Sequence, residues 1–208
     1  MKLGELTSAS FLDELASGKP TPGGGGAAAY TGALATALIS MVANLTVGKK
    51  DYKDVEDNIQ DILVETEMHR LDLLKLVDKD AEVFSELMAS FQLPKTTEKE
   101  KAKRTETIQA ALKAAAAVPL EIARKCEVVI KLSSEIVGIG NKNAITDATI
   151  SGILARAALR SALFNVKINL ISIKDREFVD VFNQEMTFME AKALDLENKI
   201  IKITEDRM

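Results

Sequence analysis

Residues 20–48 of this chain, PTPGGGGAAAYTGALATALISMVANLTVG, carry no charge and are closed by a lysine on each side, Lys19 and Lys49. The stretch opens with four glycines, Gly23, Gly24, Gly25 and Gly26, and continues as an Ala-rich helical pattern. A helix that starts at such a turn has free backbone N–H groups at the positive end of its dipole, where they can hold an anion or an electronegative atom. We therefore predict a central buried helix, ending near residue 47, with a binding turn at its N-terminus.

Two other interpretations of this stretch stay open. It is long enough to span a membrane, but it is poor in Leu and Phe and contains seven Ser, Thr, Tyr and Asn residues, which favours a buried helix in a protein core. The four glycines can also be a flexible connection. They match neither the dinucleotide fingerprint nor the P-loop, because no GK[ST] follows them and no strand precedes them.

The length, composition and net charge of the chain argue against several classes of protein. A length of 208 residues with 47% hydrophobic content fits a single domain, residues 1–208, with a sizeable core. A net charge of −4 predicts no general attraction to nucleic acid or to a membrane surface. The only cysteine, Cys126, excludes an internal disulfide, and with the only histidine, His69, it offers few ligands for a metal site. No apolar signal segment opens the chain, so we expect a cytoplasmic protein.

Hydrophobic spacing predicts an all-α bundle of about six or seven helices, several of them long. Pro119 should kink or interrupt one helix, because proline lacks an N–H and crowds the preceding turn. Thr146 should cap another helix, with Asp147 placed favourably for its dipole. Helices with faces this rich in small residues often pack against a second copy, so we expect a homodimer. The charged segment 95–104 should be a solvated loop and helix start, with Thr96 or Thr97 as its cap. The predicted helices cover about residues 8–17, the glycine turn to 47, 55–91, 108–118, 122–137, 147–173 and 176–203.

Asp80 breaks the pattern of its helix. Positions 73, 76, 77, 80, 83, 84 and 87 form one helical stripe, and every residue in it is apolar except Asp80. An ionised carboxylate is costly to bury, so this one should have a raised pKa or a specific partner. A raised pKa makes Asp80 a candidate proton donor. The alternative is an ion pair with a buried Lys or Arg that only holds the fold together.

A second helix carries a polar ladder on one face, Ser161, Asn165, Asn169 and Ser172. Buried polar side chains need hydrogen-bond partners, so the ladder either joins neighbouring helices or binds a polar ligand. Lys49 and Lys50 follow the central helix, where cations are common and where they can also receive an acidic substrate tail. We expect His69, among charged neighbours, to lie on the surface.

Four segments, in this order, carry a likeness to a known family: PTPGGGGAAAYTGALATALISMVANLT, LVDKDAEVFSELMASFQLPK, ALKAAAAVPLEIA and GNKNAITDATISGILARAALRSALFNVKINL. Together they resemble the formiminotetrahydrofolate cyclodeaminase / methenyltetrahydrofolate cyclohydrolase family over nearly the whole chain. The glycine turn, the aspartate before Ala-x-x-Phe and the last segment are specific in combination. The chain has Thr146 before Asp147, where the family commonly has serine.

The resemblance implies an all-helical fold, a homodimer or larger assembly, a folate substrate, and neither a metal nor a redox cofactor. It places the family's acidic proton donor on Asp80. It also implies that the folate cleft is lined by the glycine turn, Asn141, Asp147, Asn165 and Asn169. Some members carry this domain behind a formiminotransferase domain, whereas this chain begins at the domain's own first helix.

Two related reactions follow from the resemblance. A cyclodeaminase converts 5-formiminotetrahydrofolate to 5,10-methenyltetrahydrofolate and ammonia, and a cyclohydrolase opens the methenyl ring with water to 10-formyltetrahydrofolate. Both need proton transfer at the carbon that bridges N5 and N10. A chain without the fused transferase favours the cyclohydrolase. A non-catalytic helical scaffold remains the alternative of another class, and it predicts that Asp80 pairs with a basic side chain and that no cleft lies beside it.

Overall fold

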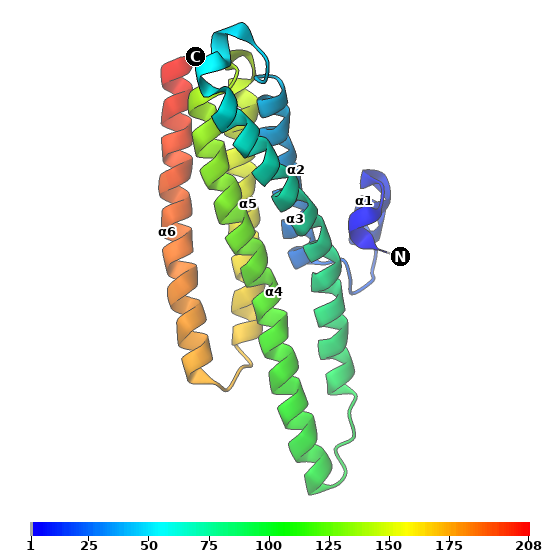
Figure 1. Cartoon of the computed structure of the whole chain (residues 1–208). Helices are drawn as coiled ribbons and strands as arrows, with labels where there is room; N and C mark the ends of the chain where they lie inside the picture. Colours follow the sequence, from blue (N-terminus) through cyan, green and yellow to red (C-terminus); the bar gives the residue numbers. More distant parts are fainter. Residues whose placement is uncertain (1) are drawn as a thin grey trace.

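The computed structural model describes residues 2–208, and in that range all regular secondary structure is helical, without a β-strand (Figure 1). All-helical architecture was the expectation from the hydrophobic spacing, and it is confirmed. The helices are α1 (Ser8–Ala16), α2 (Gly24–Asn44), α3 (Glu56–Phe91), α4 (Glu98–Ile139), α5 (Ile145–Leu170) and α6 (Arg176–Arg207), with short 3-10 turns η1 (Leu3–Glu5), η2 (Lys50–Val55) and η3 (Lys142–Ala144).

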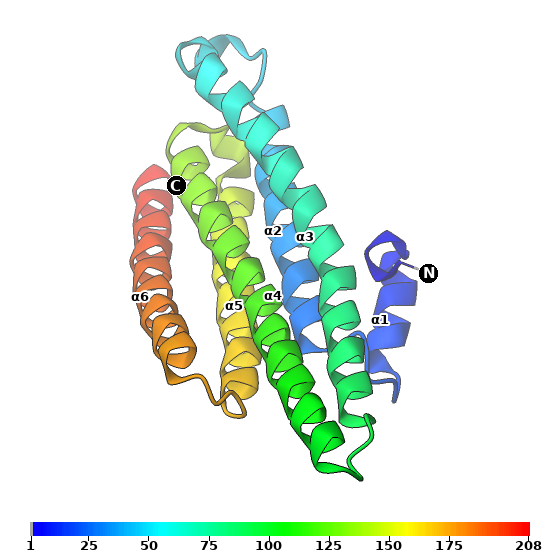
Figure 2. The same ribbon diagram turned by 60° about the horizontal axis from the view of Figure 1, so that its bottom comes forward.

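Helices α2, α3, α4 and α5 form the body of the bundle, and α6 lies against α4 and α5 (Figures 1 and 2). The short helix α1 packs beside the bundle through Phe11, whose ring stacks on Tyr30 of α2 with centroids 4.5 Å apart. The α3–α4 hairpin extends past the ends of the other helices (Figure 2). Because neighbouring helices run antiparallel, the N-terminus of α2 lies at the same end of the bundle as the C-terminus of α5.

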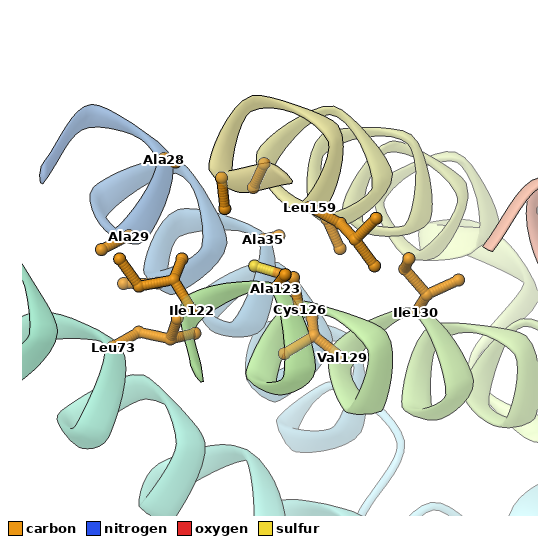
Figure 3. Close-up of a cluster of buried hydrophobic side chains, with 14 of the residues drawn as sticks. Ala28, Ala29, Ala35, Leu73, Ile122, Ala123, Cys126, Val129, Ile130 and Leu159 are labelled. Atoms are coloured by element: carbon orange, nitrogen blue, oxygen red, sulfur yellow. The ribbon is translucent and has the colours of Figure 1, made fainter. Parts of the chain in front are cut away.

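Small side chains let α2 approach its neighbours closely. A Cβ on Gly32 would lie 2.8 Å from Sγ of Cys126 on α4 and 3.2 Å from Cδ2 of Leu73 on α3. Alanines of α2 and larger aliphatic residues of the facing helices fill the rest of this contact (Figure 3). Burial raises the pKa of the Cys126 thiol to about 12, so this residue behaves as a small apolar group.

Two predicted helix boundaries were wrong. Helix α4 continues through Pro119 without a break. Its start at Glu98 agrees with the expected cap, because Thr97 forms a capping box: the Thr97 side chain accepts from the Glu100 backbone, while the Glu100 side chain accepts from the Thr97 backbone. Helix α5 begins at Ile145 after η3, so Thr146 lies inside the first turn and does not cap it.

By length and composition alone, α2 is apolar enough to cross a membrane. In this fold 56% of its most apolar window is buried inside the bundle, and a core helix passes the same test. The packing of α2 against α3, α4 and α5 accounts for its apolar composition.

His69 is buried in α3, with 7% of its surface exposed, so the expectation of a surface residue was wrong. Nearby, Lys125 of α4 forms an ion pair with Asp72 of α3 (2.7 Å). No residue in the described chain offers a hydrogen bond to Nδ1 of His69. Burial and the positive charge of Lys125 lower the pKa of His69, and Glu65 and Asp72 partly oppose that shift.

This burial predicts acid sensitivity. An unfolded chain takes up a proton at His69 near pH 6.5, whereas the folded chain takes it up only at lower pH, so the unfolded state binds more protons there and stability falls as the pH drops below about 6.5. The urea midpoint should therefore fall between pH 7.5 and pH 5.5, and His69→Leu should reduce that fall. An equal fall in both proteins would contradict the prediction.

Candidate active site

A cavity of about 310 Å³ opens at the end of the bundle where α2 begins and α5 ends. It lies between the glycine turn, the last third of α3 and the last turns of α5. The floor is polar and the α3 wall is apolar. Its lining residues are Pro20, Thr21, Gly23, Gly24, Gly25, Asp80, Val83, Phe84, Leu87, Met88, Ala115, Asn165, Ile168 and Asn169.

The glycine turn forms one side of this cavity. Gly23 precedes the first residue of α2, and the first intrahelical bond runs from Ala27 N to Gly23 O (2.9 Å). The N–H groups of residues 24–26 come before that bond, so they have no carbonyl partner in the helix. The positive end of the α2 dipole therefore points at the cavity.

Gly25 is required for a close approach between α2 and α3. A Cβ on Gly25 would lie 2.6 Å from Oδ2 of Asp80 and nearer still to Oδ1, so any side chain there would displace the carboxyl group. Gly24 is less restricted, because its Cβ would lie 3.3 Å from the amide atoms of Asn165. A Cβ on Gly23 would meet only the Pro20 carbonyl oxygen at 3.9 Å.

Asp80 projects from α3 into the cavity, and no Lys, Arg or His within residues 2–208 forms an ion pair with it. The part of its stripe that precedes it faces the core as predicted, with Leu73, Leu76 and Val77 buried. Burial raises the pKa of the Asp80 carboxyl, and the Gly26 backbone N–H partly offsets the rise. A carboxyl group with a raised pKa, open to a cavity, is able to give and take a proton.

Asn165 and Asn169 lie one turn apart on α5 and face the same cavity. Nδ2 of Asn165 donates to Ser161 O, and Nδ2 of Asn169 donates to Ala115 O and Asn165 O, each at 2.9 Å. Asn169 thus joins α5 to α4, whereas Asn165 bonds only within α5, and the side-chain oxygens of both remain available. Both alternatives for the polar ladder apply to Asn169, since it joins a neighbouring helix and lines a ligand-sized space. Ser161, by contrast, is exposed and bonds Ala157 O of its own helix.

Four predicted site residues lie at the other end of the bundle. Asn141 is buried there, where its side chain donates to Leu45 O (2.8 Å) and accepts from Asn143 N (3.1 Å). Lys49 and Lys50 are exposed just beyond α2, and Asp147 lies in the first turn of α5. Helix α2 has 21 residues, which at 1.5 Å per residue separates this end from the glycine turn by about 30 Å. Within one chain, the fold does not bring these four residues to the cavity.

The apolar wall of the cavity was missed as a functional surface. Val83, Phe84 and Leu87 were assigned to the core because they continue the stripe of Asp80. Their helical spacing from Asp80, three, four and seven positions, was the available signal that they would share its cavity. Met88 and Ile168, both exposed in part, complete this wall.

Within residues 2–208, no group of three or more His, Cys, Asp or Glu side chains is arranged to hold a metal ion. The chemistry that the cavity offers is that of one carboxyl group, free backbone N–H groups and two amide oxygens beside an apolar wall. This combination suits proton transfer on a flat, partly polar ligand.

Comparisons of sequence and of fold both relate this chain to one group of folate enzymes. The family profile described as formiminotransferase-cyclodeaminase matches residues 7–188. A methenyltetrahydrofolate cyclohydrolase of Methylorubrum extorquens is 42% identical over 99% of both chains. A formimidoyltransferase-cyclodeaminase of Rattus norvegicus is 31% identical over 85% of this chain, which corresponds to 32% of the rat protein.

Among solved structures, the formiminotetrahydrofolate cyclodeaminase of Thermotoga maritima superposes with a TM-score of 0.88. It is 34% identical to this chain, and the match covers 97% of each. The helical arrangement that creates the cavity therefore recurs in a protein of similar length.

The Asp80 environment predicts a titration that differs from that of an ordinary aspartate. Because burial raises the pKa of Asp80 in the folded chain, the folded state binds more protons than the unfolded state above pH ~3.9, and the ionised group lowers stability at neutral pH. Carboxyl ¹³C NMR, assigned by comparison with Asp80→Asn, should show a midpoint above 3.9. Asp80→Asn should also melt at or above the wild-type temperature at pH 7. A midpoint at or below the ordinary value would contradict this account.

Proposed function

The chain belongs to the formiminotransferase-cyclodeaminase family, and on that premise we propose that it is a methenyltetrahydrofolate cyclohydrolase. It would convert 5,10-methenyltetrahydrofolate and water to 10-formyltetrahydrofolate. The observation that carries the proposal is the unpaired Asp80 carboxyl group, held against the glycine turn in a cavity. The full-length similarity to a cyclohydrolase supports this choice of reaction. The same features argue against a non-catalytic scaffold, which required a basic partner for Asp80 and no cleft.

Asp80 would act first as a base and then as an acid. It accepts a proton from the attacking water as the oxygen bonds to the methenyl carbon between N5 and N10. It then returns the proton to N5 while the N5–carbon bond breaks, and the hydroxyl proton is lost as the formyl carbonyl forms. The cationic substrate and water thus give 10-formyltetrahydrofolate and one released proton. The steps balance with water and one carboxyl group, so the proposal includes no cofactor.

The glycine turn would stabilise the oxygen of the tetrahedral carbon. Free N–H groups at a helix N-terminus favour an atom that gains negative charge in the transition state. The apolar wall, including Phe84, would pack against the ring of the substrate. A cytoplasmic location is part of this proposal, and the free, buried thiol of Cys126 is consistent with a reducing compartment.

Cyclodeamination of 5-formiminotetrahydrofolate is the second candidate. Its support is the similarity in fold to the Thermotoga maritima cyclodeaminase. Here the formimino group would react in its protonated form. Asp80 would take the proton from N10 as N10 attacks the formimino carbon, and would give it to the amino group formed there, which leaves as ammonia. The two reactions share the bridged carbon, so one carboxyl group in one position serves either.

Asp80→Asn should lower kcat by at least ~100-fold, the lower end for loss of a general acid or base. Loss of the methenyl chromophore measures hydrolysis, and its appearance from the formimino substrate measures deamination. Asp78→Asn is the matched control, because Asp78 lies two positions away, accepts a hydrogen bond from Leu3 N and does not line the cavity. Near wild-type turnover in folded Asp80→Asn would remove the proposed role of Asp80.

We also propose that the chain works as a homodimer. The exposed residues Leu34 and Met41 of α2 and Leu45, which directly follows that helix, are spaced as one stripe, and Ile150 and Ile153 are exposed on the adjacent helix α5. An apolar surface of this kind favours association with a second copy. If the two copies of α2 cross in opposite directions, the far end of each chain comes near the glycine turn of its partner. In that arrangement Asn141, Asp147, Lys49 and Lys50 of each chain would lie near the substrate site of its partner.

Lys49 and Lys50 would then receive the glutamate tail of the folate. Screening acts over about 10 Å at 0.1 M salt, so this attraction should weaken as salt rises. A lower KM for polyglutamylated than for monoglutamylated substrate, reduced in Lys49→Ala/Lys50→Ala, is the measurement that bears on this role. Equal KM values for both substrates at low salt would leave the lysines as a solvated helix end.

Light scattering should find the wild-type chain dimeric and Leu34→Glu monomeric, because a charge in the apolar stripe opposes burial of that face. Turnover should fall in the monomer if each site needs its partner. Phe188→Glu is the control, since Phe188 is an exposed apolar residue on α6, away from the stripe. A monomeric wild-type protein with full activity would contradict the dimer proposal.

A further inference from the structure

Pro119 lies inside α4 and leaves one carbonyl of that helix without its usual partner. In a regular α-helix the N–H of residue 119 would donate to the carbonyl four residues earlier, that of Ala115. Proline has no N–H, so this bond is absent. Ala115 is buried and lies at the edge of the cavity, where an unpaired carbonyl would be costly.

Asn169 of α5 takes the place of the missing donor. Its Nδ2 donates to Ala115 O at 2.9 Å and to Asn165 O at 2.9 Å. An amide NH₂ has two N–H groups, and here each has a carbonyl acceptor. The reverse orientation would place Oδ1 against two carbonyl oxygens, so the two bonds determine which way the amide faces.

The consequence is a free oxygen in the cavity. No residue within 2–208 donates a hydrogen bond to Oδ1 of Asn169, and this atom is not sealed from the cavity that the residue lines. Because both N–H groups are engaged, Asn169 can only accept a hydrogen bond from a ligand. The chemistry that it selects is therefore an N–H or O–H donor.

We propose that Pro119 is a positioning residue, which acts through the Ala115 carbonyl to orient Asn169 as an acceptor for a substrate N–H group. This inference rests on the proposed function, in which the donor is an N–H of the reduced pterin ring. The proline that weakens α4 thereby gives α5 a fixed hydrogen-bond acceptor at the site. Asn165 lacks such a constraint, since its Nδ2 has one backbone acceptor, Ser161 O.

Pro119→Ala tests the positioning directly. The new N–H at residue 119 competes for the Ala115 carbonyl, so the Asn169 amide is held less firmly. KM for methenyltetrahydrofolate should rise roughly fivefold, about the effect of one weakened hydrogen bond, with kcat within about twofold because the contact is equal in ground and transition states. Helix stability should not fall, since alanine is the better helix former.

Two comparisons separate this role from ordinary packing. Val118→Ala trims a buried side chain next to Pro119 without adding an N–H, so it should lower Tm and leave KM unchanged. Asn169→Ala should raise KM about tenfold. The double variant Pro119→Ala/Asn169→Ala should be no worse than Asn169→Ala, because Pro119 acts through Asn169. An additive double variant, or an unchanged KM in Pro119→Ala, would overturn the proposal.

Side-chain NMR gives a readout that needs no activity. In the wild-type chain, both NH₂ protons of Asn169, assigned by their absence in Asn169→Ala, should exchange more slowly than those of Asn165. Pro119→Ala should speed the exchange of the Asn169 protons. Fast exchange at Asn169 in the wild type overturns the positioning even if Pro119→Ala fails to fold. If the wild type turns over neither folate substrate, the proposed function fails while slow exchange still supports the orientation of Asn169.

Discussion

The contact between the glycine turn of α2 and the carboxyl group of Asp80 is the constraint on which the site depends. Gly25 has no Cβ, so α2 can begin directly against α3, and the Asp80 carboxyl occupies the space that a side chain would fill. The same approach buries the carboxyl enough to raise its pKa while leaving it open to the cavity. A helix N-terminus and a carboxyl group are thus held side by side without a neutralising cation among the described residues.

Close packing along the rest of α2 maintains this contact. Gly32 meets Cys126 and Leu73 at distances that leave no room for a methyl group, so α2 is held against α4 and α3 about two-fifths of the way along its length. Interiors packed this tightly transmit small displacements. The small residues of α2 therefore matter for the geometry of the site as well as for the core, although most of them are distant from the cavity.

Polar interactions at the site are divided between holding the helices and meeting a ligand. Asn169 uses its nitrogen for the backbone of α4 and α5 and offers its oxygen to the cavity. Pro119, unfavourable inside a helix, removes the donor that would otherwise satisfy Ala115. A residue that is locally unfavourable in its helix thus contacts a polar group of the site. Departures from local sequence rules are expected at functional sites.

Sequence periodicity was sufficient for the helical class, the buried α2 and the Asp80 stripe, because these depend on local spacing and on which residues avoid water. It did not locate His69, which is buried where α3 packs against other helices, or the unbroken course of α4 through Pro119, where Asn169 of another helix donates to the Ala115 carbonyl. The resemblance to a family grouped Asn141 and Asp147 with the glycine turn, and Lys49 and Lys50 were assigned to the substrate tail from their place after the central helix. The folded chain places all four about 30 Å from the glycine turn, the length of α2 at 1.5 Å per residue. Sequence alone thus determined which residues are chemically unusual. A charged residue in an apolar stripe, or a glycine at the start of a helix, can be recognised from the neighbouring residues of the same helix. Only the tertiary structure decided which of these residues meet, because a long helix places the residues before it and the residues after it at opposite ends of the bundle.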